Sequence, residues 1–289
     1  MARRPEPCAW LGLKDALGAF VLHSEGTQSS RHIKPLHWYV ACRLVIEGGF
    51  RPDEITPRPP FVIEESGSGA QRRFRLSHDE DHGGIGEQAI LGGLKTKDVD
   101  VVVEKQGIGP CVAVSLKGTL KAFRNLTNRM EEAVGDCANL HISYPALVYG
   151  FLHVLRATRS GRDMPANDVA VTRDGVAVEG IIRYHDVLVR LAGRDDIRSD
   201  PTMYEAVALA LVEPTGSSTG TVVPTFPPNG SSLAFETFFG KLYKAYEQRF
   251  VYPAPSLVAI TRRLEWDPES PALSDKRVRE YQPRTSGAR

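Results

Sequence analysis

The chain has 289 residues, of which 42% are hydrophobic and 25% are charged, and its formal net charge is +1. These values are typical of a globular protein with a sizeable core, and they exclude a polycation that would bind nucleic acid through its overall field. The N-terminus lacks the apolar stretch of a secretory signal, no apolar run is long enough to span a bilayer, and the four cysteines form no CxxC pair. We therefore expect a soluble cytoplasmic protein with reduced thiols and no membrane association.

The first part of the chain predicts helices followed by polar connectors. Apolar stripes at helical spacing predict helices over residues 10–22 and 32–47. The prolines of residues 51–60 indicate an extended connector, and the glycines and arginines of residues 64–84 predict a loop. We expect residues 1–66 to form an N-terminal helical elaboration of the core.

A β-hairpin is predicted in the middle of the chain. Residues 99–104 (VDVVVE) and 111–117 (CVAVSLK) are rich in β-branched residues, and the Gln-Gly-Ile-Gly-Pro segment between them is typical of a turn. Because side chains alternate between the faces of a strand, the second strand presents Ser115 and Lys117 on one face. The hairpin brings both of them close to Asp100, at one end of a small sheet.

The rest of the chain mixes predicted helices, strands and loops. These are a helix over 119–134 that Gly135 ends, a strand over 145–155, mixed structure over 180–191, a strand over 206–212, a loop over 214–232 and a helix over 235–250. The order predicts an α/β fold with a mixed central sheet of about five strands flanked by helices. Residues 67–265 would form this core with a C-terminal elaboration, and residues 266–289 a polar, flexible tail.

A carboxylate inside a run of valines is costly unless it is paired or binds a metal, which makes Asp100 a candidate functional residue. Mg²⁺ prefers oxygen ligands and is usually held by one or two protein carboxylates. The metal polarises a phosphoryl group and activates bound water, while a lysine such as Lys117 can orient that water and offset transition-state charge. The hairpin therefore points to phosphodiester hydrolysis.

The hairpin residues resemble a known pattern. Asp100 followed by Ser115-Leu116-Lys117 resembles the signature of the PD-(D/E)XK nuclease superfamily, with Val99 in place of its proline and Ser115 in place of its usual second acid. Restriction endonucleases that cut around CCGG cores carry S-x-K on this strand and place the second acid on the following helix. The resemblance implies a restriction-endonuclease-like fold over residues 87–156, about a quarter of the chain.

The resemblance also implies roles for individual residues. Glu131 lies 14 residues after Lys117, where the resembled group has its helical acid. Asp100 and Glu131 would then bind Mg²⁺, Lys117 would position the attacking water, and Ser115 would assist indirectly. Glu87 would be the further acid that many superfamily members carry upstream on a helix.

The helix after the hairpin is basic near its start. In the resembled enzymes this helix reads base edges, so Lys121, Arg124 and Arg129 are candidates for base or phosphate contacts. The resemblance implies a type II restriction endonuclease acting on double-stranded DNA. Symmetric cutting of both strands would require a homodimer or a homotetramer.

Simpler interpretations of these residues remain. Asp100 could form a structural salt bridge with Lys117, Glu132 rivals Glu131 as the helical acid, and the basic residues could form a solvated helix face. The segment His78-Asp-Glu-Asp-His82 has two histidines that could share a metal if it were helical, but Gly83-Gly84 indicates a loop.

Three other functions compete with the restriction enzyme. The first is an antiviral effector nuclease without sequence preference, and the second is a DNA-binding module with a decayed nuclease site, which Ser115 and the missing proline would fit. The third is acyl transfer by a Ser115–Lys117 dyad. It is disfavoured because no glycine turn flanks the serine, as it would at a nucleophile elbow.

Overall fold

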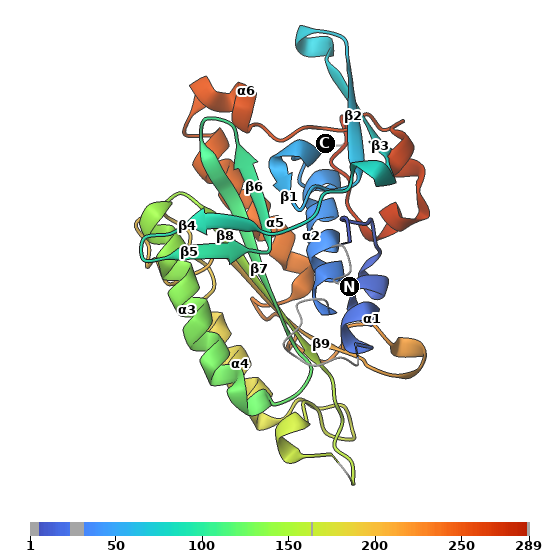
Figure 1. Cartoon of the computed structure of the whole chain (residues 1–289), viewed down its shortest axis with the longest axis vertical. Helices are drawn as coiled ribbons and strands as arrows, with labels where there is room; N and C mark the ends of the chain where they lie inside the picture. The colour runs from blue at the N-terminus through green and yellow to red at the C-terminus, as the bar shows by residue number, and fades with distance from the viewer. Residues whose placement is uncertain (1–5, 24–31, 163, 288–289) are drawn as a thin grey trace, which may run out of the picture.

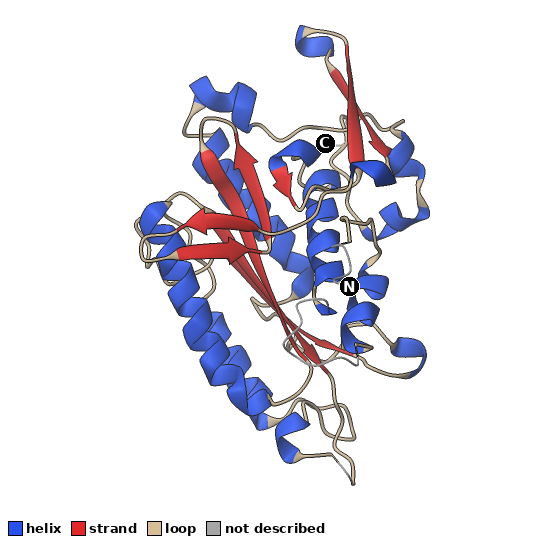
Figure 2. Cartoon of the chain, viewed as in Figure 1, coloured by secondary structure: helices blue, strands red, loops and turns tan. Residues whose placement is uncertain are grey.

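The computed structural model describes residues 6–23, 32–162 and 164–287, without the side chains of Ala70 and Arg124. Its centre is a five-stranded sheet in the order β1-β6-β7-β8-β9 (Figure 2). The strands are β1 (Ile55–Thr56), β6 (Val101–Lys105), β7 (Gly109–Thr119), β8 (Val148–Arg156) and β9 (Ala206–Val212). β1, β6 and β7 pair antiparallel, whereas β7, β8 and β9 pair parallel. The predicted α/β fold with a mixed central sheet is confirmed.

Helices cover both faces of this sheet (Figure 1). One face packs against α1 (Leu13–Val21), α2 (Lys34–Ile46) and α5 (Phe235–Tyr246), and the other against α3 (Leu126–Ser143) and α4 (Glu179–Arg190). A short α6 (Val258–Thr261) follows α5. Strands covered on both faces read as continuous apolar runs, which is why β8 and β9 could be predicted from the sequence.

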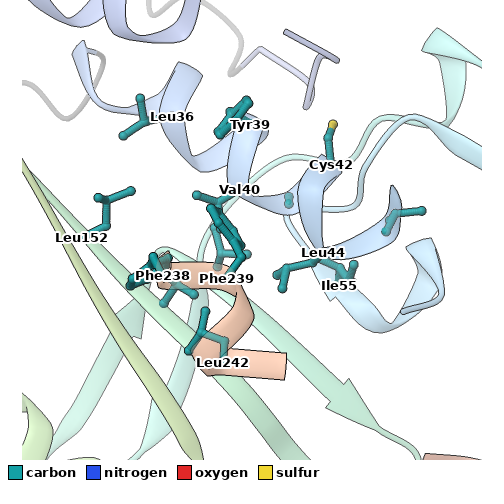
Figure 3. Packing of buried hydrophobic residues seen from close by; sticks show 14 of the residues in the cluster. Leu36, Tyr39, Val40, Cys42, Leu44, Ile55, Leu152, Phe238, Phe239 and Leu242 are labelled. Atoms are coloured by element: carbon teal, nitrogen blue, oxygen red, sulfur yellow. The ribbon is translucent and has the colours of Figure 1, made fainter. Parts of the chain in front are cut away.

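Helix α2 lies at the centre of the larger core cluster. Leu36, Val40 and Leu44 are fully buried, and Figure 3 shows this helix beside Phe238 and Phe239 of α5. Burying a large apolar side chain contributes about 1.5–3 kcal/mol. Helix α2 is therefore held firmly, and its remaining side chains have fixed positions relative to the sheet.

The C-terminal segment packs against α2 instead of forming the expected flexible tail. Trp266 is buried, and its Nε1 donates to Val45 O at 3.0 Å. Tyr281 is also buried in the same core, and the Gln282 backbone N–H donates to Glu47. The polar composition of this segment concealed these two aromatic anchors.

A hairpin over residues 61–78 occupies most of the segment 64–84, where a loop was expected. Strands β2 (Phe61–Ser66) and β3 (Arg73–His78) pair antiparallel, so the expected boundary after residue 66 falls inside one hairpin. Phe74 and Leu76 are buried on alternate positions of β3, and the exposed Arg73 and Arg75 that alternate with them conceal this period. A second hairpin, formed by β4 (Gln88–Leu91) and β5 (Thr96–Val99), leads into β6.

Helix α3 begins and ends later than the sequence predicts. It starts at Leu126 and continues through Gly135 to Ser143. A glycine inside a helix costs about 1 kcal/mol relative to alanine. Burial of Cys137 and Leu140 against the sheet outweighs this cost. All four cysteines are buried and free, as expected.

Candidate active site

Asp100 lies at a bend between β5 and β6 and contacts the neighbouring strand β7. The Leu116 N–H donates to Asp100 Oδ2, with an N···O distance of 2.7 Å. The hairpin register places Val101 opposite Val114, so the chain just before β6 lies beside the segment Ser115-Leu116-Lys117. Asp100 therefore lies beside the strand that bears Ser115 and Lys117, as the sequence predicts.

Two further side chains meet the Asp100 carboxylate from other elements. In the β4–β5 hairpin Gln88 pairs with Val99, which places Glu87 next to Asp100. Helix α2 brings His37 to the same point, with Nε2 3.5 Å from Asp100 Oδ1. One ligand atom from each of His37, Glu87 and Asp100 lies within 4.8 Å of the others.

The secondary-structure elements that supply the groups of this cluster differ from those that the sequence predicts. Glu87 was expected on a helix, but it lies immediately before strand β4. The helical group is His37 instead, which the sequence reasoning missed. His37 occupies a polar position in a largely apolar helix, and this is the only sequence signal that could have identified it.

Burial shifts the pKa values of His37 and Asp100 in opposite directions. Burial lowers the pKa of His37 to about 4, against the opposing effect of Glu87, so the imidazole is neutral at neutral pH. Burial also raises the pKa of Asp100 to about 6, although the Leu116 N–H and the Lys117 ammonium oppose this shift. At neutral pH the cluster thus contains a carboxylate beside a neutral imidazole.

This donor set fits a divalent cation. In an octahedral site with ligands at about 2.1 Å, neighbouring ligand atoms lie about 3 Å apart and opposite ones about 4.2 Å apart. The 3.5 Å between His37 Nε2 and Asp100 Oδ1 exceeds the distance between neighbouring ligands by about 0.5 Å, and a Glu87 oxygen lies within 4.8 Å of a ligand atom of each, so modest side-chain movements would let the three groups bind one ion. Within the described part of the chain, His37 Nε2 is buried without a hydrogen-bond partner, which leaves this nitrogen available as a ligand.

Lys117 is held by helix α3. Its Nζ lies 3.2 Å from Glu132 Oε1, and Arg129 contacts the other oxygen of Glu132 at 2.9 Å. Burial disfavours the charged form of Glu132, but these two cations outweigh it and lower the pKa of Glu132. Glu131 has an exposed side chain and is not part of the His37 cluster, so the structure does not bring it to Asp100.

Ser115 has a structural partner. It is buried on the α3 side of β7, and its Oγ lies 2.7 Å from the hydroxyl of Tyr149 on β8. Two residues further along the same face of β7, Lys117 pairs with His153 of β8. His153 Nε2 lies 2.9 Å from Thr119 Oγ1, so this histidine also has a structural partner.

The predicted basic residues lie where β7 leads into α3. Lys121 and Arg129 line a pocket of about 430 Å³ together with Gly118, Thr119 and Asn125. The side chain of Arg124 lies outside the described residues. The lining of this pocket begins at Gly118, the residue after Lys117 in the sequence.

The other sequence candidates have different environments. His82 Nδ1 pairs with Asp79 at 2.9 Å in a short, exposed turn. Across residues 6–23, 32–162 and 164–287, the His37 group is the one cluster of three potential metal ligands. The structure therefore gives no support to a metal site at His78-Asp-Glu-Asp-His82.

Comparison of the chain with protein-family models, curated proteins and solved structures finds no match. Among the described residues, no helix is both long and apolar enough to cross a membrane.

Proposed function

We propose that the protein is a Mg²⁺-dependent endonuclease that hydrolyses phosphodiester bonds of double-stranded DNA. The observation that carries this proposal is the bond between the Asp100 carboxylate and the Leu116 N–H, on the strand that also bears Lys117. This contact joins a partly buried acid to a strand whose next residue is a lysine. Glu87, also adjacent, adds a second carboxylate to the same point.

The side chains divide the chemistry between them. A divalent cation held by Asp100 and Glu87 supplies, when bound, a Lewis acid that polarises the phosphoryl group and lowers the pKa of bound water. The Lys117 ammonium offsets negative charge that develops on the phosphate. Glu132 fixes the position of that ammonium, so we propose that the acid of α3 positions Lys117 and that this acid is Glu132, in place of the metal ligation expected of Glu131.

DNA would reach this site along the basic pocket after β7. Lys121 and Arg129 are both exposed and both line this pocket, so each can contact a backbone phosphate. Arg124 belongs to the same segment and is proposed for the same role from the sequence alone. Because a double-strand cut needs one site for each strand, we propose a homodimer or homotetramer of type II restriction character.

Cleavage of supercoiled plasmid tests this proposal. We expect linear DNA with Mg²⁺ and none with EDTA. The Lys117→Ala variant should cut at least about 100-fold more slowly, because removal of a group that stabilises transition-state charge has effects of this size. Lys244→Ala, on the exposed surface of α5, is the matched control and should cut like the unmodified protein.

The products separate the proposal from its rivals. Discrete fragments support a site-specific restriction enzyme, and a smear supports an effector nuclease without sequence preference. Binding of DNA without cleavage in either Mg²⁺ or Mn²⁺ would reject the enzyme and support a DNA-binding module.

A further inference from the structure

We propose that His37 is a nitrogen ligand of the metal site. Its imidazole should raise the affinity of the site for Mn²⁺ relative to Mg²⁺, compared with a site formed by the two carboxylates alone. The inference rests on the proposed metal-dependent activity, whose cofactor it specifies. It can be tested by metal binding in the absence of DNA.

The first argument is the unsatisfied nitrogen. His37 Nε2 is buried and has no hydrogen-bond partner among the described residues, and it points at Asp100 Oδ1 from 3.5 Å. Buried polar groups in folded proteins nearly always have a partner, and an exception calls for an explanation such as an ion. A metal between His37 and Asp100 would satisfy both groups.

Other buried histidines of the chain show what a structural role looks like. His153 contacts Tyr184 through Nδ1 and Thr119 through Nε2. His141 contacts backbone oxygens through both of its ring nitrogens. Each of these rings has a hydrogen-bonding contact at both nitrogens, whereas His37 Nε2 has none and lies 3.5 Å from Asp100 Oδ1.

The second argument is the chemistry of the donors. Mg²⁺ is a hard cation that prefers oxygen ligands and gives up water reluctantly. Imidazole suits first-row transition metals such as iron, nickel and zinc, and Mn²⁺, although the weakest binder of that row, accepts a nitrogen ligand more readily than Mg²⁺ does. A site with the carboxylates of Glu87 and Asp100 alone suits Mg²⁺. Addition of a neutral imidazole favours Mn²⁺ over Mg²⁺.

The experiment titrates the full-length protein with Mn²⁺ alone and Mg²⁺ alone by calorimetry. Pulsed electron paramagnetic resonance of the Mn²⁺ complex then detects coupling to a directly bound nitrogen. We expect this coupling in the unmodified protein and its loss in His37→Gln. The Mn²⁺ affinity of that variant should fall about tenfold or more, while its Mg²⁺ affinity should change much less.

Two variants serve as controls. Glu87→Gln removes an oxygen ligand, so it should weaken both ions while the nitrogen coupling persists. His82→Gln, an exposed histidine outside the cluster, should change neither affinity. If His37→Gln does not fold, the nitrogen coupling in the unmodified protein still decides the question.

The outcomes separate this inference from the proposed function. Nitrogen coupling in a protein that never cuts DNA would support the inference and reject the nuclease. Mg²⁺-dependent cutting without nitrogen coupling, and with equal Mn²⁺ affinity in His37→Gln, would overturn the inference and leave the nuclease standing. In that case His37 would only help to position the Asp100 carboxylate.

Discussion

The Lys117 ammonium lies 3.2 Å from the carboxylate of Glu132, one residue beyond the acid that the sequence spacing favours. Successive residues of a helix differ in direction by about 100°, so only one of Glu131 and Glu132 can face the hairpin. Glu132 does so, and Arg129 supports it at 2.9 Å from one turn before. In the structure, the acid of α3 that contacts Lys117 is therefore Glu132.

The first prediction separates these two glutamates. Glu132→Gln removes the charge that positions Lys117, and we expect DNA cleavage to slow about 10- to 100-fold, the usual result of misplacing a reacting group. Glu131→Gln should stay within about threefold of the unmodified rate, because its side chain is exposed. Single-turnover cleavage rates measure both. A slow Glu131→Gln beside a normal Glu132→Gln would restore Glu131 as the functional acid.

The second prediction concerns Ser115, whose hydroxyl contacts Tyr149 at 2.7 Å. Ser115→Ala leaves the buried phenol without a partner, so the free energy of unfolding should fall by about 1–3 kcal/mol. Cleavage at a temperature where both proteins are folded should change little. Tyr149→Phe in the same background should recover part of the lost stability, because both unsatisfied groups are then gone. A large loss of activity with unchanged stability would instead place Ser115 in the reaction.

The third prediction concerns the basic pocket. Lys121→Ala should weaken DNA binding about equally for all sequences, and the slope of log affinity against log salt should decrease by about 0.9 for each phosphate that the variant no longer neutralises. Fluorescence anisotropy without divalent metal measures this. Arg183→Ala, an exposed residue of α4, is the control. An unchanged salt slope would remove Lys121 from the DNA interface.

The fourth prediction is a pH dependence of stability from a buried ion-pair network. Glu205 Oε1 lies 2.8 Å from Arg194 and 2.6 Å from Arg249. Burial disfavours the charged form, but His141 and both arginines outweigh it and lower the pKa of Glu205 below its ordinary value. A depressed acid pKa contributes stability that is complete above the unfolded value and is lost as the pH falls through the folded value.

Glu205→Gln should therefore lower the free energy of unfolding by about 3–5 kcal/mol at pH 7, because it leaves the arginines without their buried partner. The difference from the unmodified protein should shrink below about pH 4.3, the usual pKa of an unfolded glutamate. Urea unfolding at a series of pH values measures this, with the exposed Glu269→Gln as control. A difference that stays constant down to low pH would contradict the lowered pKa.

The sequence was sufficient for the central strands and for the position of Asp100. Continuous apolar runs predict β8 and β9, and the valine-rich hairpin with its glycine turn predicts that Asp100 meets the Ser115-Leu116-Lys117 strand. These features depend on short-range pattern and on the geometry of one turn. The β2–β3 hairpin was missed because its exposed charged residues conceal a period of two in β3.

The rest of the site depends on tertiary packing. His37 reaches Asp100 because the apolar face of α2 packs on the sheet, and no local pattern relates two residues 63 positions apart. The choice between Glu131 and Glu132 depends on where α3 starts and how it is rotated. Sequence spacing determines neither the start nor the rotation of this helix. Tertiary packing overrides local signals, as it does at Gly135, where the sequence predicts that the helix ends.

The most direct test of the central claim is the rate of Mg²⁺-dependent plasmid cleavage by Asp100→Asn. Asp98→Asn, an exposed carboxylate on β5 two residues earlier, serves as the matched control. We predict loss of cleavage by at least about 100-fold for Asp100→Asn, since the cation contributes several kcal/mol of transition-state stabilisation, and no change for Asp98→Asn. Equal rates for the unmodified protein and Asp100→Asn would contradict the assignment of this cluster as the catalytic site.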